Sequence, residues 1–352
     1  MDAASHLASL AKPPESLGLL ETWAQVLCIA QNTLKPQADP GTVLVFTADH
    51  GIKKADDALS PFPAIVSQAV FRALAAGISG TAILARSVGA HLTVIDAGID
   101  GDVSEVSGKD TSISVRHAKV AHGTADCRSA PAMDDSMLVS ALKLGSDCVA
   151  DEVSQRGAKV VAIGEVGIGN TTSAAALLSA LTGADAAECC GRGTGLDDAG
   201  LVHKVTTVRA VCALHAPDIA ARGQGDAAEQ AREALRRVGG LELAAMCGAY
   251  IEASRLGVVA VVDGFISAVA ALCAVRIQPA CRKTMVFATA LAEEPTSARG
   301  GELLAAALGA EAALSMGLRL GEASGAALSL PLLRAAAAIV GQMGTLEDAL
   351  RL

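Results

Sequence analysis

Aromatic side chains are scarce in this chain, and acidic residues outnumber basic ones. Five Phe, one Trp and one Tyr make up 2% of the 352 residues, and the formal net charge is −9. So few rings cannot supply the stacking platforms that single-stranded nucleic acid needs, and an acidic chain lacks the basic surface of a nucleic-acid-binding protein. We therefore expect no nucleic-acid partner. Any phosphate site must be local, built from backbone N–H groups and one or two cations.

Cysteine motifs and export signals are absent as well. The nine cysteines form no C-x-x-C pair and no zinc spacing. This predicts a cytoplasmic, reducing setting in which cysteine packs as a small apolar residue. The start of the chain, MDAASHLASLAKPP, lacks the basic and apolar parts of a secretory signal. Asp263 interrupts the longest apolar run, LGVVAVVDGFISAVAALCAV, so we expect a strand, a loop and a helix there instead of a membrane span.

One pattern recurs along the chain. Apolar runs without alternation end near an acidic residue and are followed by helical stretches such as TSAAALLSALTG. The runs TVLVFTADHGI, HLTVIDAGI, KVVAIGEVGIGN and GVVAVVDGF end at Asp49, Asp96, Glu165 and Asp263, and a further run is KTMVFATA. Such runs are typical of strands buried on both faces of a parallel sheet. The order predicts an α/β fold with the acids at the carboxyl edge of the sheet, where ligands bind.

The two ends of the chain differ from its middle. Residues 1–35 hold a Pro-Pro turn and an amphipathic stretch, and residues 299–352 are rich in Ala and Leu and almost free of β-branched runs. Both ends are predicted to be helical. We expect them to pack together as a small helical domain against a large α/β domain of residues 36–298, which holds the substrate site. The polar residues 100–135 predict a long excursion.

Two glycine-rich stretches are candidates for holding an anion. In GEVGIGNTTSAAALL, Asn170 or Thr171 can cap the helix that follows, whose free N–H groups attract negative charge. On that stretch alone, an ordinary capped turn is the better interpretation, because neither G-x-G-x-x-G nor a Walker A loop is present. GRGTGLDDAGLVHK places Arg192 among alternating glycines and Lys204 on the next helix. A flexible surface loop has the same composition, but two such loops favour a phosphorylated ligand.

Two further segments offer chemistry. Glu322 lies in the mostly apolar MGLRLGEASGAALSLPLL, where desolvation would raise its pKa and suit a general base. An exposed acid at a helix N-terminus fits the same spacing. In SPFPAIVSQ, Ser60 and Gln68 flank two prolines and could bind a small heterocycle. In isolation, a plain loop before a helix explains that segment better.

Together these motifs resemble the nicotinate-nucleotide–dimethylbenzimidazole phosphoribosyltransferases. GEVGIGNTT, GRGTG and LRLGE occur in that family's order, with AKPPESLGLLE, FTADHGI, SPFPAIVSQ and VVDGFISAVAAL, across residues 10–350. The resemblance implies transfer of phosphoribose from nicotinate mononucleotide to 5,6-dimethylbenzimidazole, giving α-ribazole 5′-phosphate and nicotinate for the lower ligand of cobalamin. It also implies a homodimer with a Rossmann-like large domain and a small helical domain from both termini, using no cofactor and no metal.

The resemblance also assigns roles to residues. Glu322 would be the general base that removes the benzimidazole proton, so that the other ring nitrogen attacks C1′ with inversion. Glu165 would stabilise the cationic ribose, and Lys204 would lie near the nucleotide. The base pocket would contain Ser60, Pro61, Phe62, Gln68 and Leu320, and the nucleotide and phosphate site would contain Gly167, Gly169, Asn170, Thr171, Arg192, Gly193, Thr194, Gly195 and Asp263.

Two segments depart from the family's pattern. Glu15 stands where the family has glycine, and residues 288–301 keep Glu294 and Pro295 but lack the family's histidines. A change in nucleotide affinity or base specificity would follow. The alternatives are a related transferase with another base or a phenol as acceptor, and a non-catalytic nucleotide-binding paralogue. An NAD-dependent oxidoreductase is a weaker alternative, because the glycine fingerprint and its partner acid do not occur together.

Overall fold

Seven parallel strands form the central sheet, in the order β3-β2-β1-β4-β5-β6-β7. The computed structural model describes residues 2–291 and 298–351. The strands are β1 Gly41–Ala48, β2 His91–Gly98, β3 Ile113–His117, β4 Val160–Val166, β5 Val259–Val262, β6 Met285–Thr289 and β7 Ala312–Leu314. The strands expected from the five apolar runs are confirmed, and the predicted α/β fold with a parallel sheet is correct.

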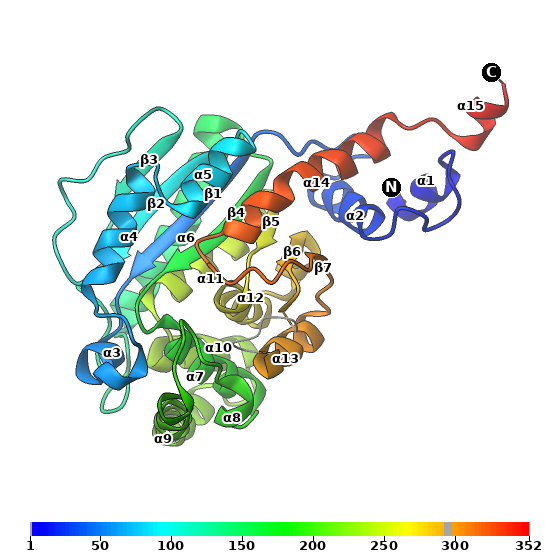
Figure 1. The fold of residues 1–352 in the computed structure, drawn as a ribbon. Helices are drawn as coiled ribbons and strands as arrows, with labels where there is room; N and C mark the ends of the chain where they lie inside the picture. Colours follow the sequence, from blue (N-terminus) through cyan, green and yellow to red (C-terminus); the bar gives the residue numbers. More distant parts are fainter. Residues whose placement is uncertain (1, 292–297, 352) are drawn as a thin grey trace.

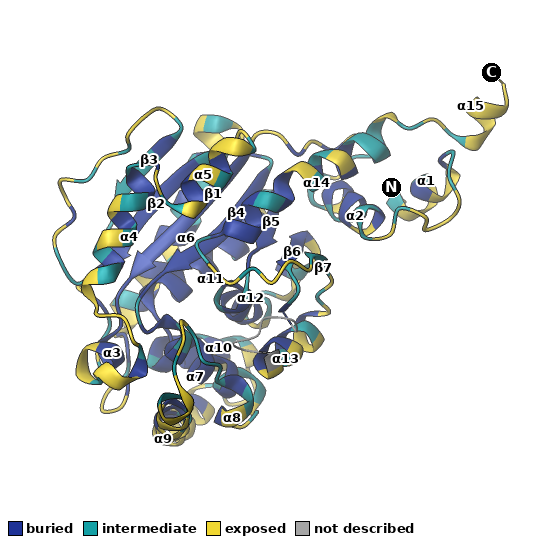
Figure 2. Cartoon of the chain, viewed as in Figure 1, coloured by how far each residue is buried: buried dark blue, intermediate teal, exposed yellow. Residues whose placement is uncertain are grey.

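The sheet is buried on both faces, which explains the absence of alternation in its strands (Figure 2). In β1, Leu44 and Phe46 belong to one hydrophobic cluster, while Val43 and Val45 belong to the other. Each side chain of the strand therefore meets a layer of helices, so the whole run must be apolar.

Helices cover the two faces of the sheet (Figure 1). One hydrophobic cluster joins the sheet to α6, α7 and α9 to α13, and the other joins it to α2, α4, α5 and α14. The helices are α1 Ala3–Ser9, α2 Leu19–Gln31, α3 Gly51–Ala55, α4 Ile65–Ala75, α5 Gly80–Ser87, α6 Asp135–Arg156, α7 Asn170–Thr182, α8 Ala186–Cys189, α9 Asp198–Arg222, α10 Ala227–Val238, α11 Leu241–Arg255, α12 Phe265–Ile277, α13 Ala298–Leu308, α14 Ser324–Gln342 and α15 Leu346–Leu350. Short 3₁₀ turns occupy Asp57–Leu59 and Pro279–Thr284.

The two ends of the chain lie together, as expected. His6 Nε2 is 3.0 Å from the carbonyl oxygen of Val340, and the Ala11 N–H donates to the Gly344 oxygen at 2.9 Å. Figure 1 shows α1, α15 and the end of α14 projecting from the sheet. The division into domains 36–298 and 1–35 plus 299–352 stays a prediction.

Two local expectations need correction or detail, and a third is confirmed. Residues 299–352 are not all helical, because Ala312–Leu314 forms β7 beside β6. The polar excursion of residues 100–135 contains the edge strand β3. The longest apolar run is β5, a loop and α12, as predicted. Among the described residues, Ile65–Ser87 and α14 are long and apolar enough for a membrane span by composition, but 56% of the α14 window is buried inside the fold.

Candidate active site

A cavity of about 340 Å³ opens at the carboxyl edge of the sheet. Glu165 at the end of β4, Asp263 after β5 and Thr289 at the end of β6 form part of its wall. The starts of α7 and α12, the segment before α14, one face of α4, the loop of residues 191–194 and Lys204 of α9 form the rest. The expectation that ligands bind where the strands end therefore has a matching hollow in the fold.

Most of the site residues predicted from the sequence meet in this cavity. Its lining includes Phe62, Glu165, Gly167, Asn170, Thr171, Gly193, Thr194, Lys204, Asp263, Leu320 and Glu322. An adjoining hollow of about 20 Å³ is lined by Ser60, Pro61, Gly169 and Arg192. Gln68 and Gly195 line neither hollow. Glu294 and Pro295 lie outside the described residues.

Glu165 is held by the helix that follows its strand. Its carboxylate is buried and accepts a hydrogen bond from the side-chain amide of Asn170. The expectation that Asn170 or Thr171 caps α7 is therefore wrong, since the N-cap is Gly169 with φ 98° and no side-chain bond. Asn170 instead orients the carboxylate, because its amide is turned back toward the strand end.

Lys204 is a buried cation without a carboxylate partner among the described residues. From α9, its Nζ donates to Thr171 Oγ1 at 2.9 Å and to the Gly191 carbonyl at 3.1 Å. Burial lowers its pKa to about 8. Arg192, the other predicted cation, is already paired with Asp198. The unmatched positive charge at this loop is therefore that of Lys204.

Glu322 lies in a strained turn ahead of α14. Gly321, Glu322 and Ala323 have φ values of 75°, 59° and 64°, and each non-glycine residue in this region costs about 1–2 kcal/mol. Gly164 of β4 supports the turn, because a Cβ there would lie 2.1 Å from Ala323 N. Burial raises the pKa of the Glu322 carboxyl, with a smaller opposing effect of Thr81. Its Oε2 atom is buried and has no hydrogen-bond partner within the described part of the chain.

Comparison with known proteins identifies the family. A family model described as phosphoribosyltransferase matches residues 1–350. A Pseudomonas putida protein named nicotinate-nucleotide–dimethylbenzimidazole phosphoribosyltransferase is 42% identical over 99% of this chain and 92% of its own length. Its Pseudomonas aeruginosa namesake is 41% identical with the same coverage. The crystal structure of CobT from Thermus thermophilus matches with a TM-score of 0.86 at 34% identity, covering 99% of this chain and 97% of that chain.

The chain belongs to the nicotinate-nucleotide–dimethylbenzimidazole phosphoribosyltransferase family. It is therefore a phosphoribosyltransferase, and the resemblance seen in the sequence is confirmed.

Asp263 of this phosphoribosyltransferase links the sheet to the Glu322 segment. Its Oδ1 accepts the N–H of Ala326, in the first turn of α14, at 2.9 Å. Gly325 lets the two elements approach, because a Cβ there would lie 3.1 Å from the same oxygen. Thr289 Oγ1 donates to the Asp263 carbonyl oxygen at 2.5 Å. The start of α14 is therefore fixed to the ends of β5 and β6.

An apolar wall of the phosphoribosyltransferase's cavity was missed from the sequence. Val66 and Val70 lie four positions apart on α4 and line the cavity beside Phe62 and Leu320. That spacing puts two residues on one helical face and was the available signal. Gln68, two residues after Val66, points elsewhere, with its amide nitrogen 3.4 Å from the Asp100 carbonyl oxygen. The other lining residues not predicted are Val166, Ile168, Gly191, Gly264, Phe265, Ile266, Ser267, Thr289, Leu318, Arg319, Gly321 and Ser324.

Proposed function

We propose that this enzyme transfers phosphoribose from nicotinate mononucleotide to 5,6-dimethylbenzimidazole, giving α-ribazole 5′-phosphate and nicotinate. The relatives are named for this nucleotide and this base. The observation that carries the proposal is the content of one cavity. It contains a buried cation without a counter-charge, Lys204, and a desolvated carboxylate with an unpartnered oxygen, Glu322, among the described residues.

The phosphate end of the nucleotide is proposed to bind where α7 and α9 meet. Lys204 supplies the positive charge, and the first turn of α7 adds the partial positive charge of a helix N-terminus. Gly193 lies against both, because a Cβ there would be 2.9 Å from Thr171 Oγ1 and 3.7 Å from Lys204 Nζ. The loop therefore brings its backbone close to the proposed phosphate position, with Gly167, Gly169, Asn170, Arg192, Thr194, Gly195 and Asp263 proposed around the nucleotide.

The chemistry proposed for Glu322 is that of a general base. One benzimidazole nitrogen forms a bond to C1′ while the other gives its proton to Glu322. The bond from C1′ to the pyridinium nitrogen breaks, and its electron pair leaves with nicotinate from the opposite face, which inverts C1′. Nicotinate departs without needing a proton, because the leaving nitrogen was cationic. A carboxylate with a raised pKa is suited to this role, since its acid–base equilibrium then lies closer to neutral pH.

Glu165 is proposed to face the ribose. Positive charge develops at C1′ as the pyridinium bond breaks, and a fixed carboxylate in a water-poor cavity stabilises that charge strongly. Its bond from Asn170 holds the carboxylate in one orientation, so little reorganisation is needed during the reaction.

The base is proposed to lie against the apolar wall near Glu322. Phe62 and Leu320 contribute to that wall directly, and Ser60 and Pro61 are proposed at its margin. Gln68 is proposed to join them by turning away from the Asp100 carbonyl oxygen when the base binds. A cytoplasmic homodimer is proposed as well. Leu346 and Leu350 on the projecting arm are 60% and 80% exposed, which suits a surface covered by a second copy.

The test is to incubate the protein with nicotinate mononucleotide and 5,6-dimethylbenzimidazole, without added metal, and to detect α-ribazole phosphate by mass spectrometry. Glu322→Gln keeps the shape of the side chain but cannot take up the proton. We expect it to lower kcat by about 10²–10⁴-fold, the usual contribution of a general base. Glu302→Gln, an exposed acid on α13, is the matched control and should retain full activity.

Other outcomes separate the alternatives. Product formation that survives Glu322→Gln would contradict the assigned base. Binding of nicotinate mononucleotide without transfer to any base or phenol would identify a non-catalytic paralogue. Transfer to adenine or a phenol, but not to 5,6-dimethylbenzimidazole, would change the acceptor and leave the donor site as proposed.

A further inference from the structure

A layer of buried polar side chains lies against the Gly167–Gly169 loop, and none of them lines the cavity. Asp49, directly after β1, accepts hydrogen bonds from Ser67 Oγ at 2.5 Å and from the Asp100 N–H at 2.8 Å. Ser67 Oγ in turn accepts the Ile168 N–H at 3.2 Å. The middle of the loop is therefore tied to β1 and α4 through two buried side chains.

His50, the next residue, connects two more elements to the same place. Its Nε2 lies 2.9 Å from Glu242 Oε1, in the first turn of α11, and both side chains are completely buried. Its Nδ1 lies 2.9 Å from Ser173 Oγ, in the first turns of α7. Each ring nitrogen thus lies near an oxygen atom of a different helix, Ser173 Oγ of α7 and Glu242 Oε1 of α11.

The loop rests directly on this histidine. A Cβ at Gly167 would lie 3.4 Å from His50 Nε2 and 2.4 Å from the Ala48 carbonyl oxygen. A Cβ at Gly169 would lie 3.5 Å from His50 Cβ and 2.6 Å from Lys53 Cβ. The contacts with Ala48 and Lys53 leave room only for glycine, while His50 is at ordinary packing distance from both positions, so the loop packs against the end of β1, His50 and α3 together.

We propose that His50 is a positioning residue that, through Ser173 and the Gly167–Gly169 loop, sets the affinity of the site for the phosphate end of the nucleotide. The inference rests on the proposed function, which places the phosphate at the start of α7, directly after this loop. His50 does not touch the ligand. It fixes the loop and the start of α7 before the ligand arrives, and a preformed donor set binds more tightly than one that must be ordered.

The groups around His50 hold it in place. The charged groups that face it are Glu242 from α11 and Asp49 from the end of β1, while Lys53 of α3 is turned to Asp57. Burial lowers the pKa of His50, but the two carboxylates raise it by more. A charged His50–Glu242 pair has no net charge, so His50 acts on the loop through its position and not through a net attraction for the anion.

The test is the double variant His50→Gln with Glu242→Gln, which removes both charges and keeps groups able to hydrogen-bond. The KM for nicotinate mononucleotide should rise about tenfold, while kcat and the KM for 5,6-dimethylbenzimidazole change by less than threefold. The Kd for inorganic phosphate, measured by calorimetry, should rise in parallel. Ser173→Ala, which removes only the link to α7, should raise the nucleotide KM about threefold.

His215→Gln is the matched control. His215 is as deeply buried as His50, but its Nε2 bonds to the Cys127 carbonyl at 2.7 Å, outside the cavity lining. It should lower Tm and leave both KM values unchanged. A folded double variant, or a Ser173→Ala protein, whose nucleotide KM stays within twofold of the parent overturns the inference. A parent that binds phosphate but transfers nothing contradicts the proposed function instead, and the phosphate Kd still decides the role of His50.

Discussion

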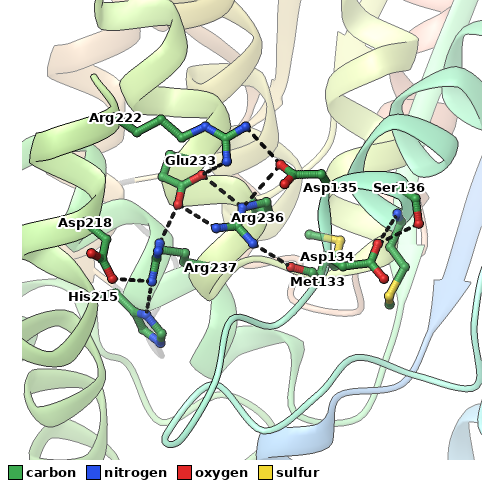
Figure 3. A network of polar contacts seen from close by, with 11 residues as sticks. Met133, Asp134, Asp135, Ser136, His215, Asp218, Arg222, Glu233, Arg236 and Arg237 are labelled. Atoms are coloured by element: carbon green, nitrogen blue, oxygen red, sulfur yellow. Dashed lines mark hydrogen bonds and ion pairs between the residues drawn. The ribbon is translucent and has the colours of Figure 1, made fainter. Parts of the chain in front are cut away.

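Two clusters of buried charge in this molecule differ in whether their charges are paired within the protein. In the first, Glu233 of α10 is surrounded by arginines (Figure 3). It accepts from Arg236 Nε at 2.9 Å, from Arg222 Nη1 at 3.1 Å and from Arg237 Nε. Burial raises the pKa of the Glu233 carboxyl, but the arginines lower that pKa by more, and the result is about 2. This cluster also ties α10 to the segment before α6, since Arg236 Nη1 donates to the Met133 carbonyl at 3.2 Å.

In the second cluster, at the cavity, Lys204 and Glu322 have no charge of opposite sign paired with them by the described residues. Burial is the main influence on both pKa values, lowering that of Lys204 and raising that of Glu322. The comparison separates two uses of buried charge. A buried charge that is paired within the protein offsets the cost of its own desolvation, and a charge left unpaired destabilises the fold until a ligand supplies the partner.

Breaking the first cluster should have the largest effect. Glu233→Gln removes the charge that three arginines share, and loss of one member of a buried pair costs about 3–5 kcal/mol of unfolding free energy. Urea denaturation would measure that loss, while kcat and KM at a temperature where the variant is folded should match the parent. Glu229→Gln, exposed on the same helix, should leave stability unchanged. A changed KM would contradict the purely structural role.

Glu165→Gln should have the next largest effect, on turnover. It removes the charge proposed to stabilise C1′, so kcat should fall about 10²–10³-fold. The Kd for nicotinate mononucleotide should change by less than threefold, as measured by calorimetry. Glu152→Gln, a buried acid bonded to Thr42 and Thr93 away from the cavity, should affect stability only. Equal losses in turnover and nucleotide binding would show that Glu165 does not act in the transition state.

Lys204→Met should separate binding from stability. Removing the cation should weaken nicotinate mononucleotide binding about 10–100-fold, since a charge-assisted contact to phosphate is lost. It should also raise Tm, because the parent must bury an unpaired charge. Calorimetry measures the expected loss of nucleotide affinity, and circular dichroism measures the expected rise in Tm. The control is Lys143→Met, on the exposed face of α6. A lower Tm would mean that Lys204 stabilises the empty enzyme.

The smallest expected effect is on pH dependence. The folded pKa of Lys204, about 8, is below its ordinary value of 10.5. Between these values the unfolded chain binds more protons, so the stability of the parent should rise with pH from 8 to 10.5 relative to Lys204→Met. Nucleotide binding should take up protons near pH 8, since phosphate raises the pKa of the lysine. Calorimetry in buffers of different ionisation enthalpy measures that proton uptake. If no protons are taken up, the proposed position of the phosphate beside Lys204 is wrong.

The sequence was sufficient for the fold and for most of the cavity. Continuous apolar runs predicted the parallel strands, and an acid at the end of each of four runs predicted the edge where Glu165 and Asp263 meet. The strand β7 was missed because Ala312–Leu314 has no β-branched residue, so its structure depends on pairing with β6. The link between Asn170 and Glu165 was missed because a local cap was the simplest use for an asparagine at a helix start.

The direction in which a side chain points was the second property that the sequence did not predict. Gln68 and Val66 are two residues apart, yet Val66 lines the cavity and Gln68 bonds toward Asp100. Which face of α4 meets the cavity depends on how the helix packs on the sheet, and no local pattern fixes that rotation.

The turn at Gly321, Glu322 and Ala323 is held in place by parts of the chain other than those that form most of the wall proposed to contact the acceptor. Its conformation is set by main-chain packing on Gly164 and by Asp263 at the start of α14. Apart from Leu320, which lies just before the turn, the apolar wall comes from side chains on other segments, such as Val66 and Val70 of α4. An engineer could therefore substitute Val66 and Val70 to admit a larger or smaller acceptor while Glu322, the proposed proton acceptor, stays in place. The same independence would let natural variants change acceptor by a few substitutions in α4 without rebuilding the site.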